Sequence, residues 1–473
     1  MVKYFYTFFF SVFSLYSFSQ TQSYSLTNKW KFNVEIDGFG SIEFLLDIKQ
    51  NTDSTFEASS RLKAIKDIIS YKQFVLAKLF TQQYKNGAFV HVLKGQIVGD
   101  TLRGVFIGPQ MAYYLNAIYS DNQIQGTLGD DKFGKNKKIS HSFSAAPFSY
   151  NQINYNFSNL DSSIKKTFEK NFYNPHILKE KEWIEFFRKL NKVSNNAHDD
   201  LEFFIGFSNL SKNIKTSHIG ILKNNPWNDL EQLNNRSYVT IKKIDSTISY
   251  IKFEGFALQD SNIVRSFFDS IIENKIPNLI IDLRGCGGGD YSSMTLSSYF
   301  IKKSLNAGFF VGNKYFNNNE ILPSNEFLKN KSPYTGNSLR EFLDEIINTG
   351  LLIGKVEPDK NLNYNGNVIV LIDKFSASAT EPIVYFLKQN NLATIIGEKT
   401  AGQMLSSTVI DVKDGWTLLI PIADYYTSDR YRIENNGVKP NIKIKSEDAL
   451  EYSIQMIFNR NNEKRNLKVK GSF

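Results

Sequence analysis

The glycine-rich segment at 285–289 is the first part of the sequence that could do chemistry. Gly-Cys-Gly-Gly-Gly follows an apolar run there, and glycines in such a turn let backbone N–H groups converge on an anion, either a phosphate or an oxyanion. The segment lacks the spacing of a dinucleotide fingerprint and the Gly-Lys-Ser/Thr of a phosphate-binding loop. An ordinary tight turn is the alternative interpretation.

A serine-rich segment at 376–381 supplies a candidate nucleophile. Ser378 stands in Ser-Ala-Ser-Ala-Thr-Glu and is followed by Pro382, a residue type that suits the first turn of a helix. Ser378 is therefore expected at a helix N-terminus, where the helix dipole and free N–H groups favour developing negative charge. The alternative is that this serine serves only as the N-cap of the helix.

Strands and helices alternate around both segments. From residue 237 onward, apolar strands are expected at 238–244, 248–253, 279–281, 368–372 and 394–396, with helices between them. Alternating βαβ units imply a largely parallel sheet covered by helices, with functional loops at the carboxyl ends of the strands. The glycine-rich and serine-rich segments both fall at such ends.

The chain before residue 237 shows two other patterns. From about 29 to 133, alternating apolar residues such as Phe32 and Val34, and turn pairs such as Asn86-Gly87, predict short antiparallel strands of a barrel or sandwich. Apolar residues at 183–193 and 201–210 fall at helical spacing, and Asp199-Asp200 is expected to cap the second helix.

The first residues predict export. Lys3 precedes an apolar run at 4–18 that is too short to span a bilayer, and Ser17 and Ser19 are small residues of the kind that a signal peptidase reads. We expect cleavage after Ser19 and a periplasmic or extracellular location. No later apolar run is long enough to cross a bilayer, so no stable membrane insertion is expected.

Composition argues against several other classes of protein. Only the formal charge of +9 suggests a nucleic-acid or surface-binding protein. Because this charge is dilute over 473 residues and a basic tail from Arg460 onward carries part of it, we expect no nucleic-acid partner. A single cysteine, Cys286, excludes a disulfide framework. Five histidines leave little room for a His-rich metal cluster. No metal and no organic cofactor is expected.

Four motifs, in a fixed order, resemble the C-terminal processing (tail-specific) protease family. They are Asp-Leu-Arg-Gly-Cys-Gly-Gly-Gly at 282–289, Ser-Ala-Ser-Ala-Thr-Glu at 376–381, Gly-Glu-Lys-Thr-Ala-Gly at 397–402 and Glu-Asn-Asn-Gly-Val-Lys-Pro-Asn at 434–441. The resemblance covers about residues 175–445. It implies a crotonase/ClpP-like core, Ser378 as the nucleophile, and an oxyanion hole made by the N–H groups of Ala379 and of Gly287 or Gly288.

One position departs from the processing proteases. In that family a lysine follows Thr-x-Gly of the third motif and acts as the general base, whereas this chain has Gln403, which cannot accept a proton at neutral pH. Lys399 lies four residues earlier, about 13 Å away along an extended segment. A dyad of Ser378 with Lys399 is therefore not favoured.

A different base resembles that of the tricorn protease branch of the same family. Ser217-His218 looks like the serine and histidine of that branch, and Glu434 looks like the glutamate that completes its tetrad with the nucleophile Ser378. An imidazole with a pKa of about 6.5 can take the serine proton at pH 7 if a neighbour fixes its tautomer. The remaining histidines are interpreted as structural: His91, His141, His176 and His198.

The spacing after His218 limits how the substrate is recognised. Only about twenty residues separate this histidine from the strand predicted near Tyr238, too few for the PDZ domain that processing proteases insert to bind substrate C-termini. The β domain, or the polar stretch from Asn306 to Arg340, which we interpret as a long loop, is expected to control access instead.

Together these features predict an exported serine peptidase with an α/β fold, in which a helical segment and an N-terminal all-β domain, a barrel or a sandwich, precede a crotonase/ClpP-like catalytic core. The expected parts are a signal peptide at 1–19, a β domain at 20–147, a linker and helical region at 148–235, a catalytic core at 236–459 and a basic tail at 460–473. The substrate is expected to be a peptide or protein. The alternative is a catalytically inactive homologue that binds peptides or apolar ligands in the same cleft.

Overall fold

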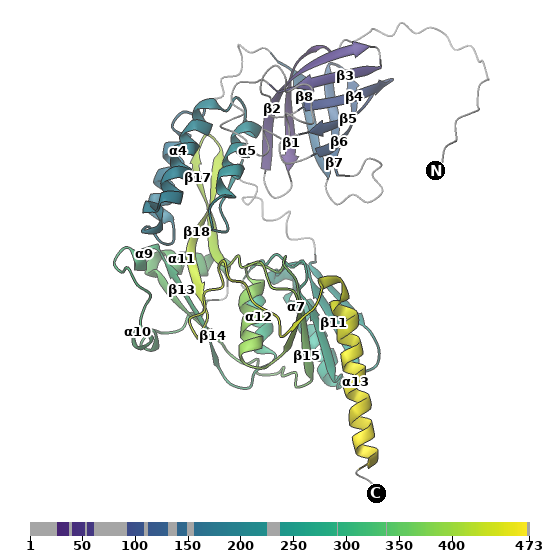
Figure 1. The fold of residues 1–473 in the computed structure, drawn as a ribbon, viewed down its shortest axis with the longest axis vertical. Coiled ribbons are helices and arrows are strands. Elements are labelled where there is room, and N and C mark those ends of the chain that lie inside the picture. Colours follow the sequence, from purple (N-terminus) through teal and green to yellow (C-terminus); the bar gives the residue numbers. More distant parts are fainter. Residues whose placement is uncertain are drawn as a thin grey trace, which may run out of the picture. The chain divides into compact units, whose positions relative to one another are not determined.

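The structure is a computed structural model that describes ten stretches of the chain. They are residues 26–36, 40–52, 54–60, 92–107, 112–130, 140–148, 156–224, 237–290, 292–336 and 338–470, with side chains up to residue 460. The predicted signal peptide, the turn pair Asn86-Gly87 and His91 lie outside these stretches. The chain divides into two compact units, one built around a β-barrel and the other an α/β unit (Figure 1). None of the described helices is long and apolar enough to span a bilayer.

Eight strands close into the barrel in sequence order. They are β1 Asn28–Ile36, β2 Gly40–Thr52, β3 Thr55–Ser59, β4 Val92–Val98, β5 Thr101–Ile107, β6 Ala112–Ser120, β7 Gln123–Gly129 and β8 Ser140–Pro147. Along β1, Trp30, Phe32 and Val34 are buried and alternate with less buried residues, because successive side chains of a strand point to opposite faces. The predicted all-β domain is thus a barrel and not a sandwich.

Three helices open the α/β unit, and their bounds are α3 Leu160–Asn171, α4 Lys181–Asn196 and α5 Asp200–Ser211. The predicted cap of α5 is confirmed, because the Asp199 carboxylate accepts a hydrogen bond from Glu202 N at 2.8 Å. The apolar faces of these helices form one core cluster with strand residues such as Trp416 and Leu418. Aromatic rings make up much of that cluster, with Phe168 and Trp183 5.2 Å apart between centroids.

A six-stranded sheet carries the predicted βαβ elements. Its order is β10 Val239–Lys243, β11 Ile248–Phe253, β12 Asn278–Asp282, β15 Asn367–Ile372, β16 Thr394–Gly397 and β19 Ile442–Lys443. All neighbours are parallel except β10 and β11, which confirms the largely parallel sheet. Helices cover it: α7 Ser261–Glu273, α8 Ser292–Ser298, α12 Thr380–Gln389 and α13 Ala449–Lys470.

The helix α13 packs on the sheet through its first half. Ala449 and Ile457 are buried against Ile280 and Ile369, which lie in the two central strands. The backbone helix continues past position 460, so the basic C-terminal residues extend α13 (Figure 1).

A second sheet, which the sequence did not predict, stands beside the first within this unit. Its strands are β14 Leu351–Val356, β13 Leu305–Gly312, β18 Trp416–Tyr426 and β17 Leu405–Lys413, with β9 Gly220–Lys223 also paired to β18. Short helices follow β13, namely α9 Asn313–Phe316, α10 Asn325–Lys329 and α11 Leu339–Thr349.

The prediction of a long polar loop from Asn306 to Arg340 is therefore wrong. The segment begins in β13 and continues through α9 and α10 to the start of α11. Buried apolar residues such as Phe309, Val311 and Phe316 anchor it, while most of its described asparagines are exposed, mainly in turns beside the short helices. The polar composition that suggested a loop comes from these exposed positions of a folded segment.

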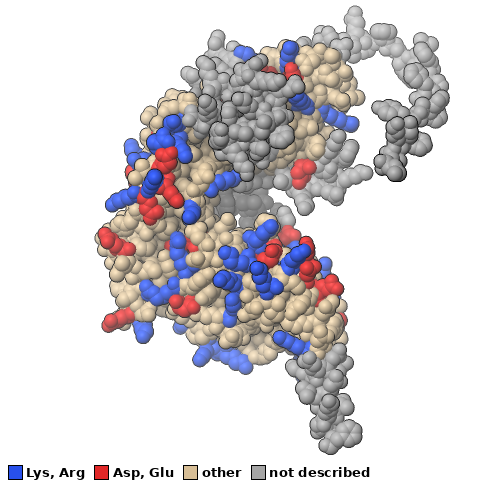
Figure 2. Space-filling model, viewed as in Figure 1, with Lys and Arg blue, Asp and Glu red and all other residues tan. Residues whose placement is uncertain are grey.

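The positive charge of the chain is mixed with negative charge on the helices of the α/β unit. Lys165 pairs with Glu169 on α3, and Arg188 and Lys189 both pair with Glu185 on α4. Figure 2 shows Lys and Arg side chains among Asp and Glu side chains over this helical region. Such interspersed charge is typical of a solvated helix face.

Candidate active site

The two segments singled out in the sequence meet at the carboxyl ends of adjacent strands. The strands β12 and β15 are parallel neighbours, with Asp282 opposite Leu371, so the turns that follow them lie side by side. The Asp373 carboxylate joins these turns, because its Oδ1 accepts hydrogen bonds from Gly285 N at 3.0 Å and from Ser376 N at 3.0 Å. This carboxylate, which sequence reasoning missed, fixes the glycine-rich turn against the serine-rich segment.

Ser378 lies in a strained backbone conformation immediately before the helix α12. Its φ is +54°, a left-handed value that non-glycine residues rarely adopt. The N-cap of α12 is Ala379, which has no side-chain cap bond, so Ser378 is not the N-cap. A Cβ added at Gly288 would lie 2.6 Å from the Ser378 Cβ, which explains why the neighbouring turn needs glycine there.

His218 faces Ser378 from the segment that precedes β9. Its Nε2 is 3.2 Å from Ser378 Oγ, and its backbone is also left-handed with a φ of +59°. Burial lowers the pKa of His218 to about 4, so its imidazole is neutral at pH 7. By contrast, His176 makes a hydrogen bond with the carbonyl oxygen of Phe316 at 2.8 Å, away from this pair.

Ser217 connects the histidine to a buried carboxylate. Its hydroxyl donates to Glu434 Oε2 at 2.9 Å and lies 2.8 Å from His218 Nδ1. Since the single hydroxyl hydrogen is used toward the carboxylate, the oxygen must accept from Nδ1–H. The neutral imidazole then presents its Nε2 lone pair to Ser378.

Glu434 is fully buried and held by backbone donors. Its Oε2 accepts from Met404 N at 2.7 Å and its Oε1 accepts from Ser217 N at 2.9 Å, while its exposed fraction is 0%. Although Glu434 precedes an Asn-Asn-Gly turn, it is therefore not a solvated surface glutamate. Asn435, which follows it, adopts a φ of +65° and donates its N–H to Gly402 O at 2.7 Å.

The proposed oxyanion donors lie beside Ser378. Among the described residues, the N–H groups of Ala379 and Gly287 have no hydrogen-bond acceptor. The backbone of Gly288 hydrogen bonds to the Cys286 thiol, and its carbonyl accepts from Phe256 N at 2.8 Å. Ala379 and Gly287 are therefore the freer pair of donors.

Cys286 is a structural residue of the glycine-rich turn. Its side chain is fully buried, and burial raises the pKa of its thiol. Thr380 Oγ1 donates to the sulfur at 3.1 Å. A buried, protonated thiol is a poor nucleophile.

The segment where the processing proteases carry lysine acts here through its backbone. Gln403 has an exposed side chain, but its carbonyl accepts from Ser378 N at 2.9 Å and its N–H donates to Glu381 Oε2 at 2.8 Å. Glu381 is fully buried, and its Oε1 also accepts from Gly402 N at 2.7 Å. The side chain of Lys399 is exposed.

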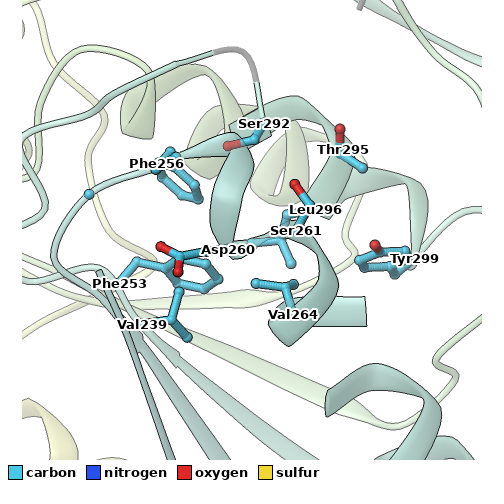
Figure 3. Close-up of a pocket in the computed structure, with 12 residues that line it drawn as sticks. Val239, Phe253, Phe256, Asp260, Ser261, Val264, Ser292, Thr295, Leu296 and Tyr299 are labelled. Atoms are coloured by element: carbon cyan, nitrogen blue, oxygen red, sulfur yellow. The ribbon is translucent and has the colours of Figure 1, made fainter. Parts of the chain in front are cut away.

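A cavity of about 460 Å³ opens at His218 and Ser378. Its walls are mostly apolar and come from α8, α11, α12, β13, β17 and β18. A second hollow, of about 30 Å³, lies apart from this pair and is lined by residues such as Val239, Phe253 and Asp260 (Figure 3). It has room for one or two water molecules at most.

No group of three or more His, Cys, Asp or Glu side chains that could hold a metal ion occurs in the described stretches.

Part of the chain is similar to a known protein family. Residues 247–444 match the family model described as Peptidase family S41. The C-terminal processing peptidase, chloroplastic, of Tetradesmus obliquus is 34% identical over 80 residues, which are 17% of this chain and 17% of that protein. The carboxy-terminal processing protease CtpA of Bacillus subtilis is 24% identical over 205 residues, which are 43% of this chain and 36% of that protein.

A crystal structure of the tricorn protease aligns with a TM-score of 0.44 and 12% identity, over 90% of this chain and 54% of that chain. The chain thus spans between about a sixth and about a third of the length of the two curated relatives named above.

The matched region includes the serine at the strand-to-helix turn and is similar to a family of peptidases. Residues 247–444 are thus similar to Peptidase family S41, and the predicted resemblance to C-terminal processing proteases is confirmed. Ser378 and Glu434 lie inside the matched region, whereas Ser217 and His218 precede it.

Proposed function

We propose that this chain is a serine peptidase that hydrolyses peptide bonds of a peptide or protein substrate with Ser378 as the nucleophile. The observation that carries the proposal is the 3.2 Å approach of Ser378 Oγ to His218 Nε2, at the end of an unbroken relay through Ser217 to Glu434. Nucleophile, base and orienting group are the three parts that acyl transfer by serine requires.

In the proposed mechanism, Ser378 Oγ attacks the scissile carbonyl carbon and its proton passes to His218 Nε2. The oxyanion that forms is held by the N–H groups of Ala379 and Gly287, a contribution of about 3 kcal/mol per donor. His218 then gives the proton to the leaving amine as the C–N bond breaks. Water attacks the acyl-enzyme by the same route and regenerates the serine hydroxyl.

The relay stabilises the charged form of His218 during the step in which the imidazole accepts the Ser378 proton. Burial keeps the imidazole neutral before reaction and lowers its pKa to about 4. As the proton arrives, the imidazolium donates through Nδ1 to Ser217, whose hydroxyl donates to the Glu434 carboxylate. The oxyanion that forms at the same moment adds an opposite charge nearby.

The binding-only alternative requires a histidine that is turned away from the serine. Because His218 faces Ser378 and its tautomer is fixed by Ser217, the geometry supports hydrolysis. We also propose export after cleavage behind Ser19, and the division into a β domain at 20–147 and a catalytic core at 236–459, from the sequence patterns described above.

Labelling with a fluorophosphonate serine probe tests the proposed function. The wild-type chain is expected to be labelled at Ser378, the variant Ser378→Ala to lose the label, and His218→Ala to be labelled at least a hundredfold more slowly. Ser428→Ala, an exposed serine of the same unit, is the matched control and should label like the wild type. Persistent labelling of Ser378→Ala would overturn the nucleophile assignment.

A further inference from the structure

We propose that the cavity beside Ser378 binds one bulky apolar side chain, preferably aromatic, of a peptide substrate at the residue whose carbonyl Ser378 attacks. The proposal rests on the serine peptidase function proposed above and adds the substrate class. It is carried by the size of the cavity, the side chains that form its walls and the edge strand that borders it.

The cavity has the position and size for a large side chain. It has a volume of about 460 Å³, and Ser378, His218 and Ala379 all line it. A substrate residue bonded to the reacting carbonyl therefore reaches it directly. Ligand pockets of proteins commonly measure about 300–1,000 Å³, so a methyl group would leave most of this volume unfilled.

Aromatic rings form one wall. Phe310 lies in β13, a strand paired on both sides, yet it is only half-buried while Phe309 and Val311 beside it are buried. Its ring centroid lies 4.9 Å from that of Phe342 in a T-shaped arrangement and 4.9 Å from that of Tyr425. An aromatic side chain that enters the cavity would extend this cluster by further edge and face contacts.

The helix α11 supplies another wall, through Leu339, Phe342 and Leu343. Phe342 and Ile346 are buried and anchor the helix on the second sheet, and the Ser338 hydroxyl caps its N-terminus by accepting from Glu341 N at 3.2 Å. Because α11 is fixed in this way, its half-buried Leu343 gives the cavity a defined width.

The charges in the cavity do not suit a basic side chain. Of the described residues that line the cavity, only Asp290 is acidic. Its Oδ1 accepts from Ser292 N at 2.9 Å and its Oδ2 accepts from Leu258 N at 2.7 Å, so both oxygens already hold backbone groups. A lysine or arginine would lose its hydration among apolar walls without a dedicated partner.

A peptide fits this site better than a free acyl chain. Residues 406–409 of β17 line the same cavity, and in the described part of the chain β17 pairs only with β18. The free edge of a strand can hydrogen bond to the backbone of an extended peptide, and pockets beside it then select side chains. An acyl chain has no groups that could use this edge.

Matched peptides and two helix variants test the proposal. Three fluorogenic peptides differ only in the residue before the scissile bond, which is Phe, Ala or Lys, and kcat/KM is expected to be at least tenfold higher for Phe. Leu343→Trp, which fills the cavity, should lower kcat/KM for the Phe peptide at least tenfold and lower the ratio of kcat/KM for the Phe peptide to that for the Ala peptide at least threefold. Ile347→Trp, one turn further along α11, 53% exposed and outside the cavity, is the control and should change neither.

A second variant keeps the test decisive if Leu343→Trp does not fold. Leu343→Ala widens the cavity and should raise the ratio of kcat/KM for a Trp peptide to that for the Phe peptide at least threefold. An unchanged ratio, or faster cleavage of the Ala or Lys peptide, would overturn the proposal. So would faster hydrolysis of a long-chain p-nitrophenyl ester than of every peptide.

The two proposals fail differently in this experiment. If the fluorophosphonate probe labels Ser378 and the peptide preferences are absent, the cavity assignment is wrong and the serine peptidase function stands. If the probe labels no residue of the wild-type chain, the proposed function is wrong and the substrate class falls with it.

Discussion

The barrel and the α/β unit bury very different side chains. Among the described residues, the barrel buries aromatic and aliphatic groups, and Ser60 is its buried polar side chain. The α/β unit buries whole carboxylates, of which Glu381 and Glu434 are fully enclosed. A buried carboxylate costs several kcal/mol unless it is hydrogen-bonded, so each of these is held by backbone N–H groups. Packing alone explains the barrel, whereas the α/β unit carries groups that packing does not require.

The backbone differs in the same way. In the described part of the barrel, the non-glycine residues with positive φ are Asp121 and Asn122 in the tight turn between β6 and β7, and these residue types tolerate that conformation. In the α/β unit, positive φ occurs at Ser378, a residue type that does not favour it, and at His218 in the same site, as well as at residues outside the site such as Lys275 and Arg430. Strain of this kind persists where the surrounding structure fixes it, and it gathers at functional sites. The comparison predicts that changes in the site alter the rate and changes in the barrel alter stability.

The largest effect is expected for Ser378→Ala. We expect kcat/KM for peptide hydrolysis to fall roughly 10⁴- to 10⁶-fold, because the proposed nucleophile is lost. Stability should be unchanged, because Ser378 bonds to Gln403 O and Glu381 N through its backbone. Steady-state kinetics and urea denaturation measure the two quantities. A residual activity above one hundredth of the wild type would contradict the assignment.

The second largest effect is expected for Glu434→Gln, which should lower kcat/KM roughly 10²- to 10⁴-fold. Glutamine lacks the negative charge that stabilises the imidazolium through Ser217, and its NH₂ would face a backbone N–H, of Ser217 or of Met404, where the carboxylate now accepts. Kinetics at pH 7 check this loss. Glu447→Gln, at an exposed site, is the control, and equal effects of the two variants would refute the relay.

Trp30→Ala tests whether the barrel contributes to stability and not to the rate. The indole is fully buried in the barrel and its Nε1 donates to Leu26 O at 3.0 Å, so its removal should cost about 3–5 kcal/mol of barrel stability. The kcat/KM for a short peptide should stay within twofold. Denaturation and kinetics on the same sample separate the effects, and a hundredfold loss of rate with little loss of stability would contradict the division of roles.

The smallest effect concerns pH. Because burial lowers the pKa of His218 to about 4, the base form persists as pH falls and is lost only below that value. We expect kcat/KM to change less than about 1.5-fold between pH 8 and pH 6, whereas a histidine with a pKa of about 6.5 would give a fall of about fourfold. Circular dichroism at each pH controls for unfolding. A fourfold fall in kcat/KM without unfolding would contradict the lowered pKa of His218.

The sequence predicted the parts of the molecule that depend on local pattern. The parallel sheet, the cap of α5 by Asp199 and the serine before α12 follow from periodicity, residue type and motif order. The closure of the barrel and the second sheet depend on pairing between distant strands, which single-strand patterns do not encode.

The site shows the same limit. Ser378, His218 and Glu434 were named from motifs, but Asp373 and Glu381 were missed as positioning residues, because their role lies in backbone contacts made across loops. Asp373, the acidic residue at the end of a buried strand and beside the serine segment, was the available signal. The helices between β13 and β14 were missed because their exposed polar faces dominate the composition.

The central claim is that a neutral His218 offers its Nε2 lone pair to Ser378, because Ser217 and Glu434 hold the proton on Nδ1. Nitrogen-15 NMR of the histidine rings at pH 7, with His218→Gln to assign the signal, measures this directly. The account predicts a neutral ring protonated on Nδ1. A ring protonated on Nε2, or on both nitrogens, would contradict it.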